Sequence, residues 1–389
     1  MLPFDFHPRT RIIFGPDTVT QIGELARDLR MQRILLVTDP GIVAAGHAGR
    51  VQELLDPTTR SITVFDTVHE NPTTRDVDAC LAVARAADVD GIVGLGGGSS
   101  LDVAKGCNFL LTGGGVMSDY WGVGKATRPM LPMIAVPTTA GTGSECQSFA
   151  LIADEKTHQK MACGDPKAAA RIALLDPRLT LTQPPRVTAA TAVDALAHAV
   201  ETAVTSKRTP LSLLFSREAF RQIHGALGRV AAQPDDVEAR GAMQLGAAFA
   251  GLAIENSMLG AAHSAANPLT AHYNVVHGEA VGLMLPHVVR FNSAAADASE
   301  GYAQLAMSCA AQNGGAAKGG RAVDDLVGCI ESLLDGAGIP RSLEAHGVPR
   351  DAIGMLADEA ARQWTVRFNP RTVGAEQFAR LYEEAYGAG

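Results

Sequence analysis

The chain has 389 residues, of which 47% are hydrophobic and 19% are charged, and it carries a net charge of −8. A chain of this length predicts about two to three domains. The acidic balance argues against a dedicated binder of nucleic acids or anionic membranes, because such proteins carry a basic patch. The sequence has no apolar run long enough to predict a membrane-spanning helix and no apolar signal core near its start.

Cysteine usage indicates a reducing compartment. Six cysteines occur, at positions 80, 107, 146, 163, 309 and 329. None belongs to a Cys-x-x-Cys pair, so the sequence predicts neither a zinc ribbon nor a disulfide framework. We therefore expect a cytoplasmic protein with reduced thiols.

The first half of the chain alternates short apolar runs with helical periods. Apolar side chains recur every three or four positions after the turns at 15–17 and 71–72, which predicts a helix after each turn. Continuous apolar runs predict buried strands at 33–38, 61–65, 91–95, 133–136 and 171–175. Strands that alternate with helices predict an α/β domain over residues 1–184, built on a parallel sheet.

Pro184-Pro185 ends this alternation. Strand signals nearly vanish after it, and residues 185–389 are predicted to form an all-helical domain. Many of its periodic segments are rich in alanine, and they predict helices at 188–205, 210–227, 236–260, 278–292, 299–312 and 321–335. The Gly- and Ala-rich stretch at 313–320 predicts a flexible loop.

A glycine-rich segment at 94–102, GLGGGSSLD, follows a predicted strand and opens a helix. Glycines let the backbone approach a phosphate, and a helix N-terminus offers free N–H groups and the positive end of its dipole. The segment is neither a Rossmann fingerprint nor a P-loop, and a plain turn capped by Ser99 or Ser100 is the alternative. Asp39, after the strand at 33–38, adds weight to nucleotide binding, because an acid there accepts ribose hydroxyls and repels a 2′-phosphate.

A second loop, PTTAGTGSE at 137–145, also follows a predicted strand. Its hydroxyl groups form a dense set of hydrogen-bonding partners for phosphates, a ribose or an amide. An ordinary polar loop is the alternative interpretation of this segment.

Asp194 and His198 lie four residues apart in an otherwise apolar helix, so they share one face. Burying both is costly unless something pairs them, and a metal ion would do so. His263, expected at the end of an apolar helix, and His277, at the start of another, are further candidate ligands. One carboxylate and three imidazoles suit a divalent transition metal such as Fe²⁺ or Zn²⁺. The alternative is an internal hydrogen bond between Asp194 and His198.

Four segments, in this order, resemble the iron-containing, or group III metal-dependent, alcohol dehydrogenase family. They are GGGSSLDVAK (96–105), PTTAGTGSE (137–145), DALAHAVE (194–201) and HSAANPLTAHYNVVHGEAVGLMLPHVVRFN (263–292). The resemblance implies an N-terminal α/β nucleotide-binding domain, an all-α C-terminal domain and an active site in the cleft between them, in the dehydroquinate synthase-like architecture. It also implies an enzyme that transfers a hydride between NAD(H) and a small alcohol or aldehyde.

The same resemblance implies roles for individual residues. Metal ligation falls on Asp194, His198, His263 and His277, with His263 and His277 also expected to be catalytic. Cofactor contacts are implied for Asp39, Gly97, Gly98, Ser99, Asp102, Thr138, Thr139, Thr142, Lys160 and Leu179. Candidates for the substrate wall are Phe149, Leu151, Ile254 and Trp364.

Asn267 departs from the family pattern, because many relatives have a further His four residues after the third metal ligand. An Asn cannot shuttle a proton near neutral pH. A proton relay would then need another route, and His272, Lys160 or a water chain are the candidates.

Several alternative functions are open at this point. A glycerol dehydrogenase-like or maleylacetate reductase-like oxidoreductase fits the same resemblance. A dehydroquinate synthase-like lyase is disfavoured because no cluster of Lys and Arg in the helical half could grip a phosphate. A nucleotide-binding protein without catalysis and a metallohydrolase are the alternatives from other classes.

In the favoured mechanism the metal acts as a Lewis acid on the substrate oxygen. A homodimer or higher homo-oligomer is expected by analogy with the family.

Overall fold

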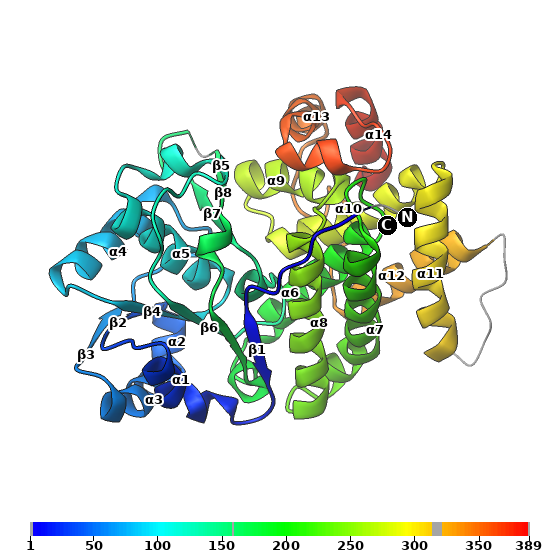
Figure 1. Cartoon of the computed structure of the whole chain (residues 1–389). Helices are drawn as coiled ribbons and strands as arrows, with labels where there is room; N and C mark the ends of the chain where they lie inside the picture. The colour runs from blue at the N-terminus through cyan, green and yellow to red at the C-terminus, as the bar shows by residue number, and fades with distance from the viewer. Residues whose placement is uncertain (1–2, 158, 313–320, 388–389) are drawn as a thin grey trace. The chain divides into compact units, whose positions relative to one another are not determined.

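A computed structural model describes residues 3–157, 159–312 and 321–387 of the chain (Figure 1). The chain forms two compact units. One is His7–Gln183, and the other contains Pro184–Gly389 together with the N-terminal segment up to Phe6. The predicted loop at 313–320 lies outside the described residues.

The first unit, the α/β unit, contains a six-stranded parallel sheet in the order β1-β9-β6-β4-β2-β3. The five predicted strands are confirmed, with small differences at their ends. The sixth, β1, is a four-residue edge strand with partly exposed residues, so it lacks the buried apolar run that marks the inner strands. The strands are β1 (Arg11–Phe14), β2 (Arg33–Val37), β3 (Ser61–Phe65), β4 (Gly91–Gly96), β6 (Met133–Pro137) and β9 (Ile172–Leu175).

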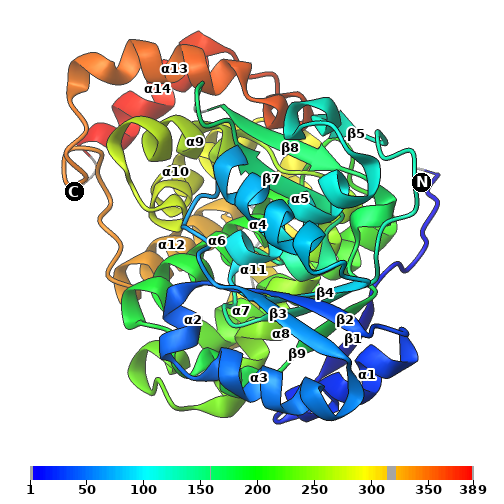
Figure 2. The same cartoon turned by 90° about the vertical axis from the view of Figure 1, so that its left-hand side faces the viewer.

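Helices cover both faces of this sheet (Figure 2). Leu35 and Ile92 pack in a core with α4 and α5, whereas Ile34 and Val93 point to the other face and pack with α1 and α3. Because both faces are buried, the strands appear in the sequence as continuous apolar runs rather than alternating ones. The helices are α1 (Ile22–Asp28), α2 (Pro40–Ala44), α3 (His47–Leu55), α4 (Thr74–Ala86) and α5 (Gly98–Gly113).

A small three-stranded sheet, in the order β5-β8-β7, completes the α/β unit. Its strands are β5 (Gly122–Val123), β7 (Phe149–Ala153) and β8 (Lys160–Gly164), and β7 pairs with β8 in antiparallel fashion. This sheet was not predicted from the sequence. Short 3₁₀ turns connect the elements: η1 (Thr18–Gln21), η2 (Asp56–Thr58), η3 (Met117–Tyr120), η4 (Ser144–Cys146), η5 (Pro166–Ala168) and η6 (Pro177–Thr180).

The second unit, the helical unit, has no strand within residues 184–312 and 321–387, so the predicted all-helical character is confirmed. It runs from green to red in Figure 1. Its helices are α6 (Pro185–Thr202), α7 (Pro210–Ala232), α8 (Val237–Glu255), α9 (Ala261–Tyr273), α10 (His277–Asn292), α11 (Ala296–Gln312), α12 (Ala322–Gly336), α13 (Ile353–Arg362) and α14 (Ala375–Tyr386), with η7 (Arg350–Ala352) and η8 (Trp364–Phe368). Across the described ranges, no helix combines the length and apolar character that crossing a membrane requires.

One predicted helix was wrong in a way that matters for the site. The helix expected over 236–260 ends at Glu255, and His263 lies in the first turn of α9 rather than at the end of an apolar helix. At the break, Ala261 N–H and Ala262 N–H donate to the side chains of Asn369 and Glu201 instead of to a preceding turn of backbone. The apolar pattern continues across the break because the residues on both sides of it are buried.

Candidate metal centre and dinucleotide site

Three imidazoles converge on one buried carboxylate in the helical unit. Oδ1 of Asp194 lies 3.5 Å from Nε2 of His198, 3.3 Å from Nε2 of His263 and 3.9 Å from Nε2 of His277. The rings of His198 and His263 stack with their centroids 4.7 Å apart. Three helices therefore bring together all four of the predicted metal ligands.

Helix α6 supplies the centre of this cluster. All ten residues from Val193 to Thr202 are buried, so this part of α6 is enclosed on every side. Because many of its side chains are the small methyl groups of alanine, neighbouring helices can approach α6 closely. Gly278, at the start of α10, lies against the backbone of Ala190, where a Cβ atom would collide with the carbonyl group. That close approach places His277 beside Asp194.

Glu201 holds His263 in place, and it was not predicted as a site residue. Its Oε2 accepts a hydrogen bond of 2.5 Å from Nδ1 of His263, and its Oε1 accepts one of 2.7 Å from Ala262 N–H. With Nδ1 donating, the lone pair of Nε2 faces Asp194. The sequence does contain a signal for Glu201, because it follows His198 by three positions on an apolar helix and so shares its face.

The donor set fits a divalent metal ion. Asp194 Oδ1 and His263 Nε2 are buried and make no hydrogen bond of good geometry within the described part of the chain. Burial raises the pKa of Asp194, but the neighbouring histidines, His198 first, outweigh it and lower the pKa. Burial lowers the pKa of His263, but Glu201 and Asp194 raise it to about 9. Two buried carboxylates thus favour positive charge here, and a cation would satisfy the orphaned atoms.

In the α/β unit, the carboxyl ends of β2, β4 and β6 meet at the same edge of the sheet, since β4 lies between the other two. The chain reverses its direction of travel across the sheet between β2 and β4, and such switch points bind ligands in α/β proteins. Asp39 follows β2, the glycine loop follows β4 and the threonine loop follows β6. The structure therefore gathers the predicted nucleotide-contacting loops.

The glycine loop and the threonine loop touch one another. A Cβ atom on Gly98 would lie 2.8 Å from Cγ2 of Thr142, and one on Gly97 would lie 3.3 Å from Cγ2 of Thr139. Gly97 is the N-cap of α5, and no side chain caps this end, so neither Ser99 nor Ser100 provides the cap that the plain-turn interpretation predicted. The first N–H groups of α5 remain available for an anion.

Asp39 and two threonines border this edge. Asp39 Oδ1 accepts from Ile42 N–H at 3.1 Å and so caps α2, while Oδ2 accepts from Ser100 Oγ at 3.2 Å. The hydroxyls of Thr38 and Thr138 are buried and have no hydrogen-bond partner among the described residues. Two orphaned hydroxyls at the ends of β2 and β6 are what a bound polar group would satisfy, and Thr38 was not predicted as a site residue.

A buried network locks the threonine loop to α5. Lys105 Nζ is fully buried and donates to Ser144 O, Ser144 Oγ and Phe149 O at 2.6, 2.8 and 2.9 Å. Asp102 Oδ1 accepts from Ser144 Oγ at 2.7 Å, and Oδ2 accepts from Leu151 N–H at 3.3 Å. Lys105 and Asp102 on α5 therefore fix the position of the threonine loop, and Lys105 was not predicted as a site residue.

The remaining predicted residues of the α/β unit have different environments. Lys160 lies at the start of β8, and its positive charge interacts with Asp102. Burial has the largest effect and raises the pKa of Asp102, whereas the charge of Lys160 is one of the influences that lower it. Leu179 is only 1% exposed and packs in the core on the α1 and α3 side of the sheet. Phe149 and Leu151 both lie on β7, with Phe149 packed over Gly164.

In the helical unit, Ile254 is buried near the end of α8, and Trp364 lies in η8 with its ring edge-on to Phe368. Asn267 Nδ2 donates to Gln363 Oε1 at 3.0 Å. His272, one candidate for a proton relay, instead pairs with Glu359 at 2.8 Å on a partly exposed surface.

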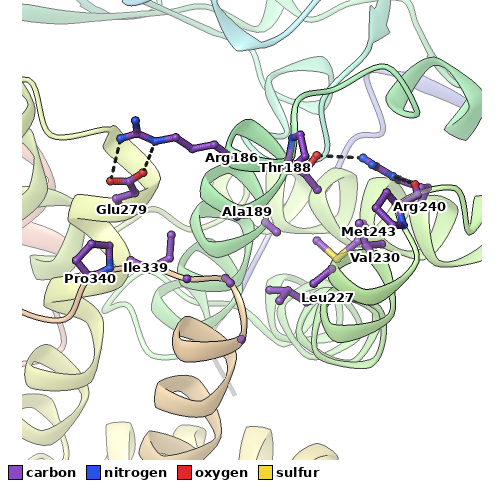
Figure 3. Close-up of a pocket in the computed structure, with 17 residues that line it drawn as sticks. Arg186, Thr188, Ala189, Leu227, Val230, Arg240, Met243, Glu279, Ile339 and Pro340 are labelled. Carbon is purple, nitrogen blue, oxygen red and sulfur yellow. Dashed lines mark hydrogen bonds and ion pairs between the residues drawn. The ribbon is translucent and has the colours of Figure 1, made fainter.

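The helical unit also contains a pocket of about 480 Å³ (Figure 3). None of the four predicted metal ligands lines it. Its rim carries the Arg186–Glu279 ion pair, and on another side Arg240 donates to Thr188 at 3.1 Å. The walls between these polar groups are largely aliphatic, with Leu227 and Val230 from α7 labelled in the view.

Comparisons with known proteins identify the family of this chain. A family model described as iron-containing alcohol dehydrogenase matches residues 8–177, and one described as the C-terminal part of the Fe-containing alcohol dehydrogenase family matches residues 188–386. The NAD-dependent methanol dehydrogenase of Bacillus methanolicus is 30% identical over 373 residues, which cover 96% of this chain and 97% of that protein. Alcohol dehydrogenase 4 of Saccharomyces cerevisiae is 32% identical over 375 residues, covering 96% of each.

Solved structures lead to the same family. A crystal structure of 1,3-propanediol oxidoreductase superposes with a TM-score of 0.94 at 30% identity, covering 99% of this chain and 100% of that one. The two family models together match nearly the whole chain. The chain belongs to the iron-containing alcohol dehydrogenase family, and at the level of that family it is a metal-dependent oxidoreductase that acts on CH–OH groups.

Proposed function

We propose that this protein is an NAD(H)-dependent alcohol dehydrogenase that interconverts a small alcohol and its aldehyde. Fe²⁺ is the proposed resident metal and Zn²⁺ the alternative, held by Asp194, His198, His263 and His277. The proposal extends the family assignment to the coenzyme and to the residues of this chain. It includes a cytoplasmic location, supported by the absence of any Cys-x-x-Cys pair, and a homo-oligomeric state, supported by analogy.

One observation carries the proposal. Three imidazole nitrogens lie between 3.3 and 3.9 Å from a single buried carboxylate oxygen, and two of the atoms involved make no good hydrogen bond among the described residues. An internal hydrogen bond between Asp194 and His198 would explain why the His198 nitrogen lies close to the carboxylate, but not why the nitrogens of His263 and His277 do. A divalent cation accounts for all of them.

When bound, the metal supplies Lewis acidity toward the substrate oxygen. The residues of the chain prepare the site for it. Glu201 accepts the Nδ1 proton of His263 and so keeps the Nε2 lone pair directed inward. Gly278 allows α10 to lie against α6 and positions His277. Burial excludes water from Asp194 and His263, which strengthens their electrostatic interactions.

The coenzyme is proposed to bind at the carboxyl ends of β2, β4 and β6. Gly97, Gly98 and Ser99 would accept the pyrophosphate at the uncapped start of α5, with Thr138, Thr139 and Thr142 on the opposing loop. Asp39 would accept ribose hydroxyls, which favours NAD(H) over NADP(H). Asp102 is proposed to contact the cofactor, and Lys160 and Leu179 are proposed to lie near its nicotinamide end. Phe149, Leu151, Ile254 and Trp364 are proposed to form the substrate wall.

The test is NADH oxidation by metal-stripped protein, and by the same protein loaded with Fe²⁺ or Zn²⁺ under anaerobic conditions, against a panel of small aldehydes. We expect turnover only after metal loading, and the more active metal identifies the working ion. The D194N variant should bind NADH normally and lose both metal and activity. Turnover by metal-free protein, or normal activity in D194N, would refute the metal assignment. Failure to bind NADH would refute the coenzyme assignment.

A further inference from the structure

A second cluster of reactive side chains lies in the helical unit and has no part in the proposed reaction. It consists of His224 on α7, Cys309 on α11 and Cys329 on α12. One ligand atom from each of the three lies within 4.8 Å of the others. We propose that Cys309 and Cys329 form a reversible disulfide, so that the cluster is an oxidisable site on this enzyme.

The two sulfurs are already close to bonding distance. The thiol of Cys309 donates to Sγ of Cys329 with the sulfurs 2.7 Å apart. A disulfide places sulfurs about 2.05 Å apart, so a small side-chain movement would complete the bond. Two thiolates on one tetrahedral zinc ion, each about 2.3 Å from the metal, would instead lie roughly 3.8 Å apart. The spacing therefore favours a disulfide over a shared metal ion.

The surroundings make Cys329 the attacking thiol. Cys309 is buried, whereas Cys329 is partly exposed and can meet a small reagent. The hydrogen bond from Cys309 and the nearby His224 lower the pKa of Cys329 to about 6, although burial opposes them. The hydrogen bond with Cys329 and burial together raise the pKa of Cys309. A thiolate at Cys329 is the nucleophile that thiol–disulfide exchange requires.

The oxidant is a small disulfide such as oxidised glutathione, and the exchange proceeds in two steps. The Cys329 thiolate attacks one sulfur of the reagent, breaks its S–S bond and releases one small thiolate, which takes up a proton. Cys309, which then no longer lies against a thiolate, loses its proton and attacks Cys329 Sγ, forming the internal bond and releasing the second small thiol. The two protein thiols are oxidised and the reagent disulfide is reduced to two thiols.

The chain contains a matched internal control. Cys80 and Cys107 also lie close enough to interact, but both are fully buried in the α/β unit. A reagent that discriminates by access and thiolate character should leave this pair reduced.

The experiment uses the metal-loaded enzyme, equilibrated with mixtures of reduced and oxidised glutathione and quenched with N-ethylmaleimide under denaturing conditions. All six cysteines are free in the reduced protein, so its mass should show six adducts. The oxidised protein should show four adducts, with the cross-linked peptide joining Cys309 to Cys329. Dithiothreitol should restore six. C80S should still form the cross-link, and C329S and C309S should not.

Thermal unfolding gives an independent readout. A cross-link between residues 20 positions apart restricts the unfolded chain, so the oxidised wild-type protein should melt several degrees higher than the reduced one. C329S should show no such difference. H224Q should slow alkylation of Cys329 by up to about tenfold, because less of it would be thiolate at neutral pH.

Three results would overturn the proposal. Six free thiols after oxidation would show that the pair cannot close. A glutathione adduct that remains on Cys329 would show that Cys309 cannot resolve it. A second equivalent of zinc that protects both thiols in wild-type protein, and that C329S lacks, would make the cluster a metal site.

Discussion

Nδ1 of His263 donates a hydrogen bond of 2.5 Å to Oε2 of Glu201, and the same carboxylate accepts from the backbone N–H of Ala262. Glu201 thus fixes both the ring of a proposed metal ligand and the first turn of the helix that carries it. The carboxylate comes from α6, the helix that also contributes Asp194 and His198. The position of His263 is therefore set by the helix that carries Asp194 and His198, two of the other proposed ligands.

Replacing Glu201 with Gln should weaken metal binding by about 10- to 100-fold, since it removes the charge that orients and activates His263. The measurement is retention of Fe²⁺ or Zn²⁺ against a competing chelator. E300Q, at an exposed position on α11, is the matched control and should retain metal like the wild type. Equal metal affinity in E201Q and wild type would contradict the role assigned to Glu201.

The D39N variant tests the coenzyme preference. Asn keeps an oxygen that can cap α2 but removes the negative charge, so the ratio of NADPH to NADH affinity should rise roughly tenfold. The measurement is the dissociation constant of each coenzyme by fluorescence titration. D236N is the control, because Asp236 caps α8 in the same manner in the helical unit. An unchanged ratio in D39N would mean that Asp39 does not contact the ribose.

The contact between Gly278 and Ala190 should not tolerate a methyl group. G278A would push the start of α10 away from α6, so we expect a loss of about 1–3 kcal/mol in the free energy of unfolding, together with weaker metal binding as His277 moves. G228A is the control, because a Cβ there meets nothing within 4 Å, and it should stabilise α7 by roughly 0.5–1 kcal/mol. Urea denaturation and metal titration of both variants distinguish the outcomes. Wild-type metal affinity in G278A would show that this contact does not position His277.

His287 should make the protein less stable in mild acid. Burial, with a smaller contribution from Arg290, lowers the pKa of His287 to about 4, from the ordinary value of 6.5. Between these values the unfolded chain binds a proton that the native state does not, so stability falls as the pH falls. From pH 6.5 to 5 this amounts to about 2 kcal/mol.

The H287Q variant isolates that effect. Its free energy of unfolding should change less over this range than that of the wild type, with both proteins compared at the same saturating metal concentration. The metal ligands also titrate, and comparing the two proteins cancels their contribution. Parallel pH profiles for wild type and H287Q would rule out His287 as the source of acid sensitivity.

The sequence was most informative about the buried strands, where a run of apolar residues has one physical cause, burial on both faces of the sheet. Strands buried on both faces are continuous apolar runs, so β2, β4, β6 and β9 were predictable, and β3 was predicted although it is a partly exposed edge strand. The short strands β1 and β5 were missed, because both are partly exposed and partial exposure relaxes the demand for apolar residues. The break before His263 was missed because burial on both sides continues the apolar pattern across it.

Local spacing along α6 was enough to place Asp194 and His198 on one face, and the motifs were enough to suggest the family. The spacing of residues along the chain does not tell whether His263 and His277 meet that face of α6, or whether Glu201 accepts a hydrogen bond from His263. Those contacts depend on how three helices pack. The same is true of Lys105 beneath the threonine loop and of the two cysteines 20 residues apart. The sequence by itself determined the elements and the chemistry available to them, because propensity and periodicity are local. The tertiary structure alone decided which groups share a site, because burial and packing act between residues far apart in the chain.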